Sequence, residues 1–180
     1  MIMIDFNNFL SQVLNGYRTN YDVETFDDDS TELVATATMH VKHTQTFILK
    51  EFEMSSASAD EYVYVFKTDH LTVEKAKEFI DRAYDLGYPQ IDLEHTTFKK
   101  QHMCTRLVAL VFCDSADEEA LKIIKKCRIY KSFQFSLKGW MEMHTVTVDL
   151  SDGKVISNHY GRETAKYLKK HVDHYMKNVK

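Results

Sequence analysis

Proline, glycine and cysteine are scarce in this 180-residue chain, which contains one proline, five glycines and three cysteines. Because no proline-rich or glycine-rich linker interrupts the sequence, we predict one domain over residues 1–180. The cysteines Cys104, Cys113 and Cys127 are odd in number and lack CxxC spacing, so neither a disulfide framework nor a cysteine zinc site is expected. These thiols suit the core of a protein in a reducing compartment.

Long apolar runs are also missing. The apolar start, Met1–Ile4, is short, has no basic residue before it and is followed by Asp5, which does not fit a secretory signal. No segment approaches the roughly 20 apolar residues of a membrane-spanning helix. We therefore expect a cytoplasmic protein with no membrane contact.

Motifs that define a reaction are absent too: there is no phosphate-binding loop, dinucleotide fingerprint, nucleophile elbow or HExxH. The acidic run Asp27–Asp29 does not begin a calcium loop, because the required glycine and glutamate are missing downstream. His171 and His174 have a metal-chelating helical spacing, but His174 lies opposite the apolar stripe of its helix. We expect no metal site and no cofactor.

Charge is divided unevenly along the chain. Residues 1–96 carry 7 basic and 18 acidic side chains, whereas residues 97–180 carry 16 basic and 9 acidic ones. Such asymmetry can indicate a basic surface for RNA or another anionic partner. Alternatively, the two halves attract each other within one fold. We favour this second interpretation, because the basic residues fall mostly on helix faces rather than in one block, and we do not expect nucleic acid binding.

Apolar periodicity predicts helices and strands in alternation. Helical spacing indicates helices at 5–17, 72–86 and 162–177, and a capping-box spacing at Ser115 and Glu118 indicates one more. Alternating or continuous apolar runs predict strands; these lie at about 32–41, 47–54, 61–67, 106–113 and, as two or three strands, 129–157. Asp152-Gly153 is the strongest hairpin signal. Together they predict an α+β domain with a largely antiparallel sheet of five to seven strands and about four helices.

Two stretches, 47–86 and 133–177, share the order strand–strand–helix and form a faint internal repeat. The segment Phe135–Trp140, with Thr145–Leu150 and Val155–Asn158, resembles an uncharacterised family of small bacterial proteins that carry a domain of unknown function. The likeness extends over most of the chain after Leu33 and implies no activity or functional residue. Separately, residues 117–156 are similar in element order to the PepSY-type domain, chiefly in the strand–Asp-Gly–strand end.

Two groups of polar residues are candidate sites. Trp140, Glu142 and His144 share one strand face, where a carboxylate could orient an imidazole for acid–base chemistry. The alternative is a strand end that emerges from the core. Asn158 and Arg162 lie where a strand gives way to a helix, a place where backbone N–H groups and an arginine can bind an anion. Ordinary helix capping by Asn158 would explain the same residues.

The leading functional hypothesis is a non-catalytic protein that binds a partner protein or a small ligand through these five residues. It rests on the absence of a catalytic motif. The alternative is an enzyme that uses Glu142 and His144, and a third hypothesis is RNA binding by the basic C-terminal half. The apolar character of both faces of the strands also leads us to expect a homodimer.

Overall fold

A computed structural model describes residues 4–27, 31–40, 58–91 and 102–178. The helices are α1 (Phe6–Tyr17), α2 (Val73–Gly87), α3 (Glu118–Lys126) and α4 (Arg162–Asn178), with a short 3₁₀ helix at Tyr88–Gln90. The strands are β1 (Asp22–Thr25), β2 (Leu33–His40), β3 (Ser58–Leu71), β4 (His102–Ala116), β5 (Tyr130–Ser132), β6 (Trp140–Asp149) and β7 (Lys154–Ser157). They confirm the predicted α+β class. The predicted strand at 47–54, which begins the first stretch of the repeat, falls outside the described residues, so the repeat stays a prediction.

One sheet holds all seven strands in the order β1-β2-β3-β4-β6-β5, with β7 also paired to β6. The pairings of β1 with β2, β2 with β3, β5 with β6 and β6 with β7 are antiparallel. The central strands β3, β4 and β6 are parallel to one another, because the chain returns between them through α2 and then through α3. The sheet is therefore largely antiparallel at its sides and parallel at its centre.

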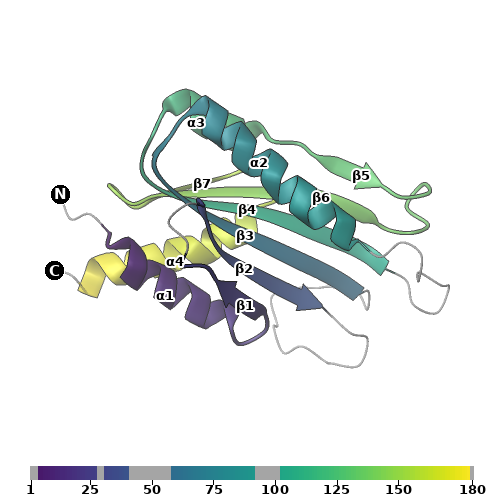
Figure 1. The fold of residues 1–180 in the computed structure, drawn as a ribbon, viewed down its shortest axis with the longest axis horizontal. Helices are drawn as coiled ribbons and strands as arrows, with labels where there is room; N and C mark the ends of the chain where they lie inside the picture. The colour runs from purple at the N-terminus through teal and green to yellow at the C-terminus, as the bar shows by residue number, and fades with distance from the viewer. Residues whose placement is uncertain (1–3, 28–30, 41–57, 92–101, 179–180) are drawn as a thin grey trace.

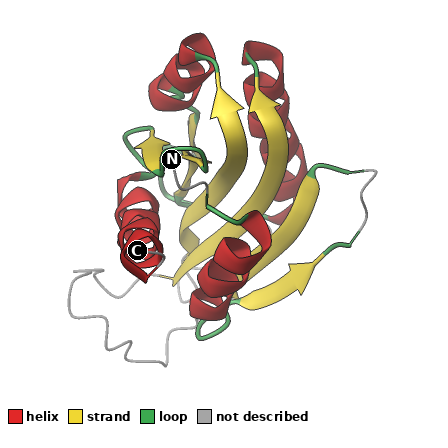
Figure 2. Ribbon diagram, turned by 90° about the vertical axis from the view of Figure 1, so that its left-hand side faces the viewer, coloured by secondary structure: helices red, strands yellow, loops and turns green. Residues whose placement is uncertain are grey.

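Helices cover both faces of the sheet, α1 and α4 on one and α2 and α3 on the other (Figures 1 and 2). The first layer forms around Phe9 and Val13 of α1 and Leu168 and Val172 of α4, all of which lie on apolar stripes and are buried. The hydroxyl of Tyr167 donates to the Val13 carbonyl at 3.1 Å and ties the two helices together.

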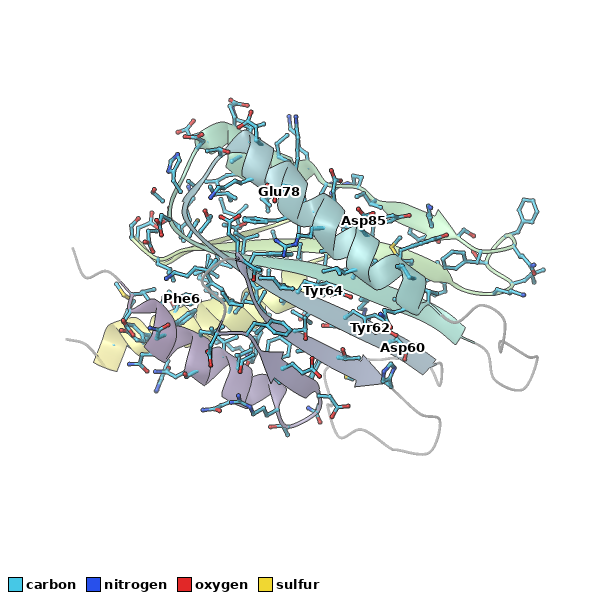
Figure 3. All side chains as sticks on the ribbon, viewed as in Figure 1. Phe6, Asp60, Tyr62, Tyr64, Glu78 and Asp85 are labelled. Atoms are coloured by element: carbon cyan, nitrogen blue, oxygen red, sulfur yellow. The ribbon has the colours of Figure 1, made fainter. Side chains whose placement is uncertain are left out.

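The second layer packs α2 against β3 and β4. Thr72 caps α2, its hydroxyl accepting from the Lys75 N–H at 3.3 Å. Phe79 of α2 stacks on Phe66 of β3 with ring centroids 4.7 Å apart. In Figure 3, Tyr62 and Tyr64 lie on this face of β3, whereas Glu78 and Asp85 point away from the sheet on the outer side of α2.

Two sequence-based predictions of local geometry have different outcomes. The Asp152-Gly153 hairpin is confirmed: it joins β6 to β7, and Gly153 has φ +74°, which an L side chain rarely adopts. The capping box at Ser115 and Glu118 is wrong, because the N-cap of α3 is Asp117. The predicted N-cap lies two residues before the observed one, and the spacing of two residues does not fix where the helix begins.

The acidic and basic halves of the chain share the sheet. Strands β1–β3 come from the acidic half and β4–β7 from the basic half, and they meet where β3 pairs with β4. Each face carries one helix from each half, so the basic helices α3 and α4 lie on opposite faces. The two basic helices therefore do not share one face of the sheet, and mutual attraction of the two halves stays a prediction.

Candidate functional site

A line of charged side chains crosses the three central strands near their amino ends. Glu61 of β3, Arg106 of β4 and Glu142 of β6 are register partners, so they lie side by side on the face that also carries α1 and α4. Nη1 of Arg106 lies 3.5 Å from Oε2 of Glu61, and its Nε lies 3.8 Å from Oε1 of Glu142. One guanidinium is thus held between two carboxylates. We call these three residues and His144 the charged row.

His144 extends the charged row along β6. It lies two residues beyond Glu142 and therefore on the same strand face. Its Nε2 lies 2.9 Å from Oε1 of Glu142, and its ring stacks at 6.3 Å on the ring of Tyr160. Two of the predicted site residues, Glu142 and His144, therefore do form a hydrogen-bonded pair.

The pKa of Glu142 is lowered by this setting. Burial acts to raise it, but the hydrogen bond and charge of His144, the charge of Arg106 and a hydrogen bond from Trp140 together outweigh burial. Glu142 is therefore ionised at neutral pH. The predicted neighbour Trp140 is half-buried beside it and donates to its carboxylate.

Tyr21, just before β1, completes the other end of the charged row. Its hydroxyl donates to Oε1 of Glu61 at 3.1 Å. Burial, followed by the charge of Glu61, raises the pKa of Tyr21 well above its ordinary value. The phenol therefore stays protonated and keeps donating at any physiological pH.

The charged row is mostly, but not completely, removed from water. The side chains of Glu61 and His144 are each 9% exposed, Glu142 is 19% exposed and Arg106 is 21% exposed. A buried ion pair contributes little net stability compared with apolar residues of the same size, because desolvation offsets the attraction. Glu142 is a partly accessible carboxylate with a perturbed pKa, and the charged row around it is therefore a candidate functional site.

Cys104 lies on the same strand face as Arg106 and is buried. Burial, followed by the charge of Glu142, raises the pKa of the Cys104 thiol to about 12. A thiol with that pKa is protonated at neutral pH and is a poor nucleophile. The chemistry available at the charged row is therefore ionic binding and proton transfer rather than thiolate attack.

Asn158, the other predicted anchor, is a buried structural link. Its Oδ1 accepts from the Gly161 N–H at 2.8 Å and the Thr145 N–H at 3.2 Å. Its Nδ2 donates to the carbonyls of Met143 at 2.7 Å and Cys127 at 3.2 Å. These bonds occupy both acceptor and both donor positions of the amide. Arg162, exposed at the start of α4, is then the member of this pair that could reach an anion.

Sequence reasoning missed Tyr21, Glu61 and Arg106. Glu61 and Arg106 each come directly before an apolar run, which is the available signal in the sequence. Their contact depends on the parallel register of β3 and β4. Within the described ranges, no group of three or more His, Cys, Asp or Glu side chains is placed to hold a metal ion.

A family model described as "Domain of unknown function (DUF8052)" matches residues 5–170. No curated protein and no solved structure matches the chain. The family match agrees with the resemblance to an uncharacterised family, whereas the resemblance of residues 117–156 to PepSY-type domains finds no support. None of the described helices is both long and apolar enough to cross a membrane.

Proposed function

The chain belongs to this family of unknown function, and we propose that its charged row binds a small organic cation, such as an amine or a guanidine. The proposal rests on one observation: a single guanidinium, that of Arg106, serves two carboxylates, Glu61 and Glu142. The two carboxylates and the one guanidinium together carry a formal charge of about −1. A bound cation would neutralise it.

Aromatic side chains beside the carboxylates support the same ligand class. Trp140 donates a hydrogen bond to Glu142 and Tyr21 donates one to Glu61, and the ring of Tyr160 stacks on the ring of His144. A cation close to an aromatic face gains about 0.5–2 kcal/mol, more where water is excluded. Two carboxylates fixed on β3 and β6, on either side of β4, need little reorganisation when a ligand arrives.

Trp140 gives a direct test, because it is the single tryptophan of the chain and is bonded to Glu142. We expect butylamine and butylguanidine to change its emission saturably, and butanol or sodium chloride at the same ionic strength to leave it unchanged. Glu142→Gln should weaken binding about tenfold or more, since a charged hydrogen bond contributes about 1.5–3 kcal/mol. Glu78→Gln, an exposed carboxylate on the far side of α2, is the matched control.

The proposal fails if no cation changes the emission, or if Glu142→Gln binds as well as the unmodified protein. A lysine-bearing peptide tests whether the bound cation is instead a lysine side chain of a partner protein. Tighter binding of the peptide than of butylamine would assign the charged row to a protein partner.

The 2.9 Å contact between Glu142 and His144 favours a second candidate, proton transfer to or from a bound molecule. Mass spectra of the ligand before and after incubation separate the two functions. In an enzyme the ligand changes mass or hydrogen–deuterium content, and His144→Gln abolishes that change while binding persists. An unchanged ligand leaves the charged row as a binding site alone.

A further inference from the structure

A second polar cluster lies at the opposite, carboxyl ends of the parallel strands. His70 near the end of β3 and Ser115 near the end of β4 are register partners. Nδ1 of His70 lies 2.8 Å from Oγ of Ser115, and Nε2 of the same ring lies 3.1 Å from Oδ1 of Asp117. In sheets with parallel strands, ligands commonly bind beyond these carboxyl ends.

The partners of His70 determine where its proton sits. A carboxylate can only accept, so the Asp117 contact places the hydrogen on Nε2 of a neutral ring. Nδ1 is then an acceptor for the Ser115 hydroxyl at 2.8 Å, a shorter contact than the 3.4 Å from the same hydroxyl to the Asp69 carbonyl oxygen. The order hydroxyl, imidazole, carboxylate is the one that activates a serine nucleophile, with the two ring nitrogens exchanged relative to the best-known triads.

The position of Asp117 supports a role beyond capping. It is the N-cap of α3, the place where an aspartate normally bonds the first N–H groups of its own helix. Its side chain makes no such bond and contacts His70 instead. Asp117 is fixed by its own N–H, which donates to the Leu71 carbonyl at 3.0 Å. The first N–H groups of α3 therefore receive no hydrogen bond from the Asp117 side chain. These N–H groups follow Ser115 closely in the chain.

We propose that Ser115, His70 and Asp117 form an acyl-transfer site for small neutral or cationic esters. Ser115, His70 and Asp117 are all exposed, so a substrate can reach the hydroxyl directly (the starts of α2 and α3 flank this end of the sheet in Figure 1). The exposed carboxylates of Glu118 and Glu119 in the first turn of α3 disfavour anionic substrates.

The reaction balances without a cofactor. Oγ of Ser115 bonds to the ester carbonyl carbon as its proton moves to Nδ1 of His70, and the carbonyl π electrons move to oxygen. When the carbonyl re-forms, the bond to the leaving oxygen breaks and the Nδ1 proton passes to that oxygen. Water then attacks the acyl-serine, giving its proton to Nδ1; the carboxylic acid leaves, and the proton returns to Ser115. Asp117 is a positioning residue that holds the ring with Nδ1 toward Ser115.

The test uses the full chain with p-nitrophenyl acetate and diisopropyl fluorophosphate as probes. We expect one equivalent of phosphoryl label, mapped by peptide mass spectrometry to Ser115, and turnover of the acetate ester. Ser115→Ala should abolish the label, and His70→Gln should slow acylation about 10²-fold or more. Ser11→Ala, which changes an exposed serine on α1, should react like the unmodified protein.

The Asp117→Ala variant distinguishes a positioning role of Asp117 at His70 from a purely structural role in the fold. Its slowed acylation should recover when sodium formate supplies a carboxylate and should not recover in sodium chloride, whereas a purely structural role would show no such difference. Absence of label, label on another residue, or an equal rate in Ser115→Ala would each overturn the proposal. Because Ser115 is exposed, an unchanged thermal midpoint should accompany its loss of reactivity.

Discussion

Oε1 of Glu142 lies 2.9 Å from Nε2 of His144, while the same oxygen lies 3.8 Å from Nε of Arg106. One carboxylate oxygen thus faces two basic side chains, one on its own strand and one on the neighbouring strand. This shared contact lowers the pKa of Glu142 in spite of its burial. The stability of the protein therefore depends on the protonation of Glu142.

Glu142→Gln should make stability less dependent on pH in acid. A carboxyl group whose pKa is lower in the folded state contributes stability above its ordinary value, 4.5, and loses that contribution as pH falls through the folded value. The unfolding free energy of Glu142→Gln should therefore decline less steeply below about pH 5. Urea titrations at several pH values measure the slope. Glu78→Gln should keep the original slope; an unchanged slope in Glu142→Gln would contradict the linkage.

The native thiols should react slowly at pH 8. Burial raises the pKa values of Cys104 and Cys113 to about 12, and it also raises the pKa of Cys127. Little thiolate is then present in the folded protein. A disulfide reagent such as DTNB should titrate three thiols at once in urea and only slowly without it. Ser11→Cys, on the exposed side of α1, should add one fast thiol; a fast equivalent in the unmodified protein would refute the assignment.

The sequence predicted helices and strands better than it predicted contacts between side chains. Helices at 5–17, 72–86 and 162–177 were readable because one apolar stripe and a capping residue such as Thr72 or Asp5 are local signals. Glu142 and His144 were readable as a pair because they share one strand face. Arg106 joins them only through the parallel register of β4 with β6, and His70 meets Ser115 only through that of β3 with β4. Local periodicity does not encode register between strands that are far apart in sequence.

Asn158→Ala should destabilise the protein by about 3 kcal/mol or more, because several buried backbone groups would lose their partner at once. The N–H groups of Thr145 and Gly161 and the carbonyl of Met143 are among them. Asn158→Asp keeps the acceptor for both N–H groups but places a buried carboxylate oxygen against the carbonyls of Met143 and Cys127, so it should also destabilise the protein. Thermal or urea unfolding measures both. Arg162→Ala, at an exposed position, should change stability by no more than about 0.5 kcal/mol.

A glycine substitution in the loop between β5 and β6 should raise the stability of the protein. Gln134, Phe135 and Ser136 have φ angles of 47°, 54° and 68°, which side chains other than glycine rarely adopt. Phe135 is also 98% exposed, so its ring contributes no packing to the fold. Relief of a left-handed residue is worth about 1 kcal/mol, and the added freedom of glycine in the unfolded chain offsets part of it.

We therefore expect Phe135→Gly to raise the unfolding free energy by a few tenths to about 1 kcal/mol. Phe135→Ser is the matched control, because it removes the exposed ring and keeps the strained backbone, and it should leave stability unchanged. If both variants gained equally, the exposed ring rather than the backbone would be the source of the cost. If Phe135→Gly lost stability, the loop bonds such as Ser132 Oγ to Ser136 Oγ at 2.9 Å would already offset the strain.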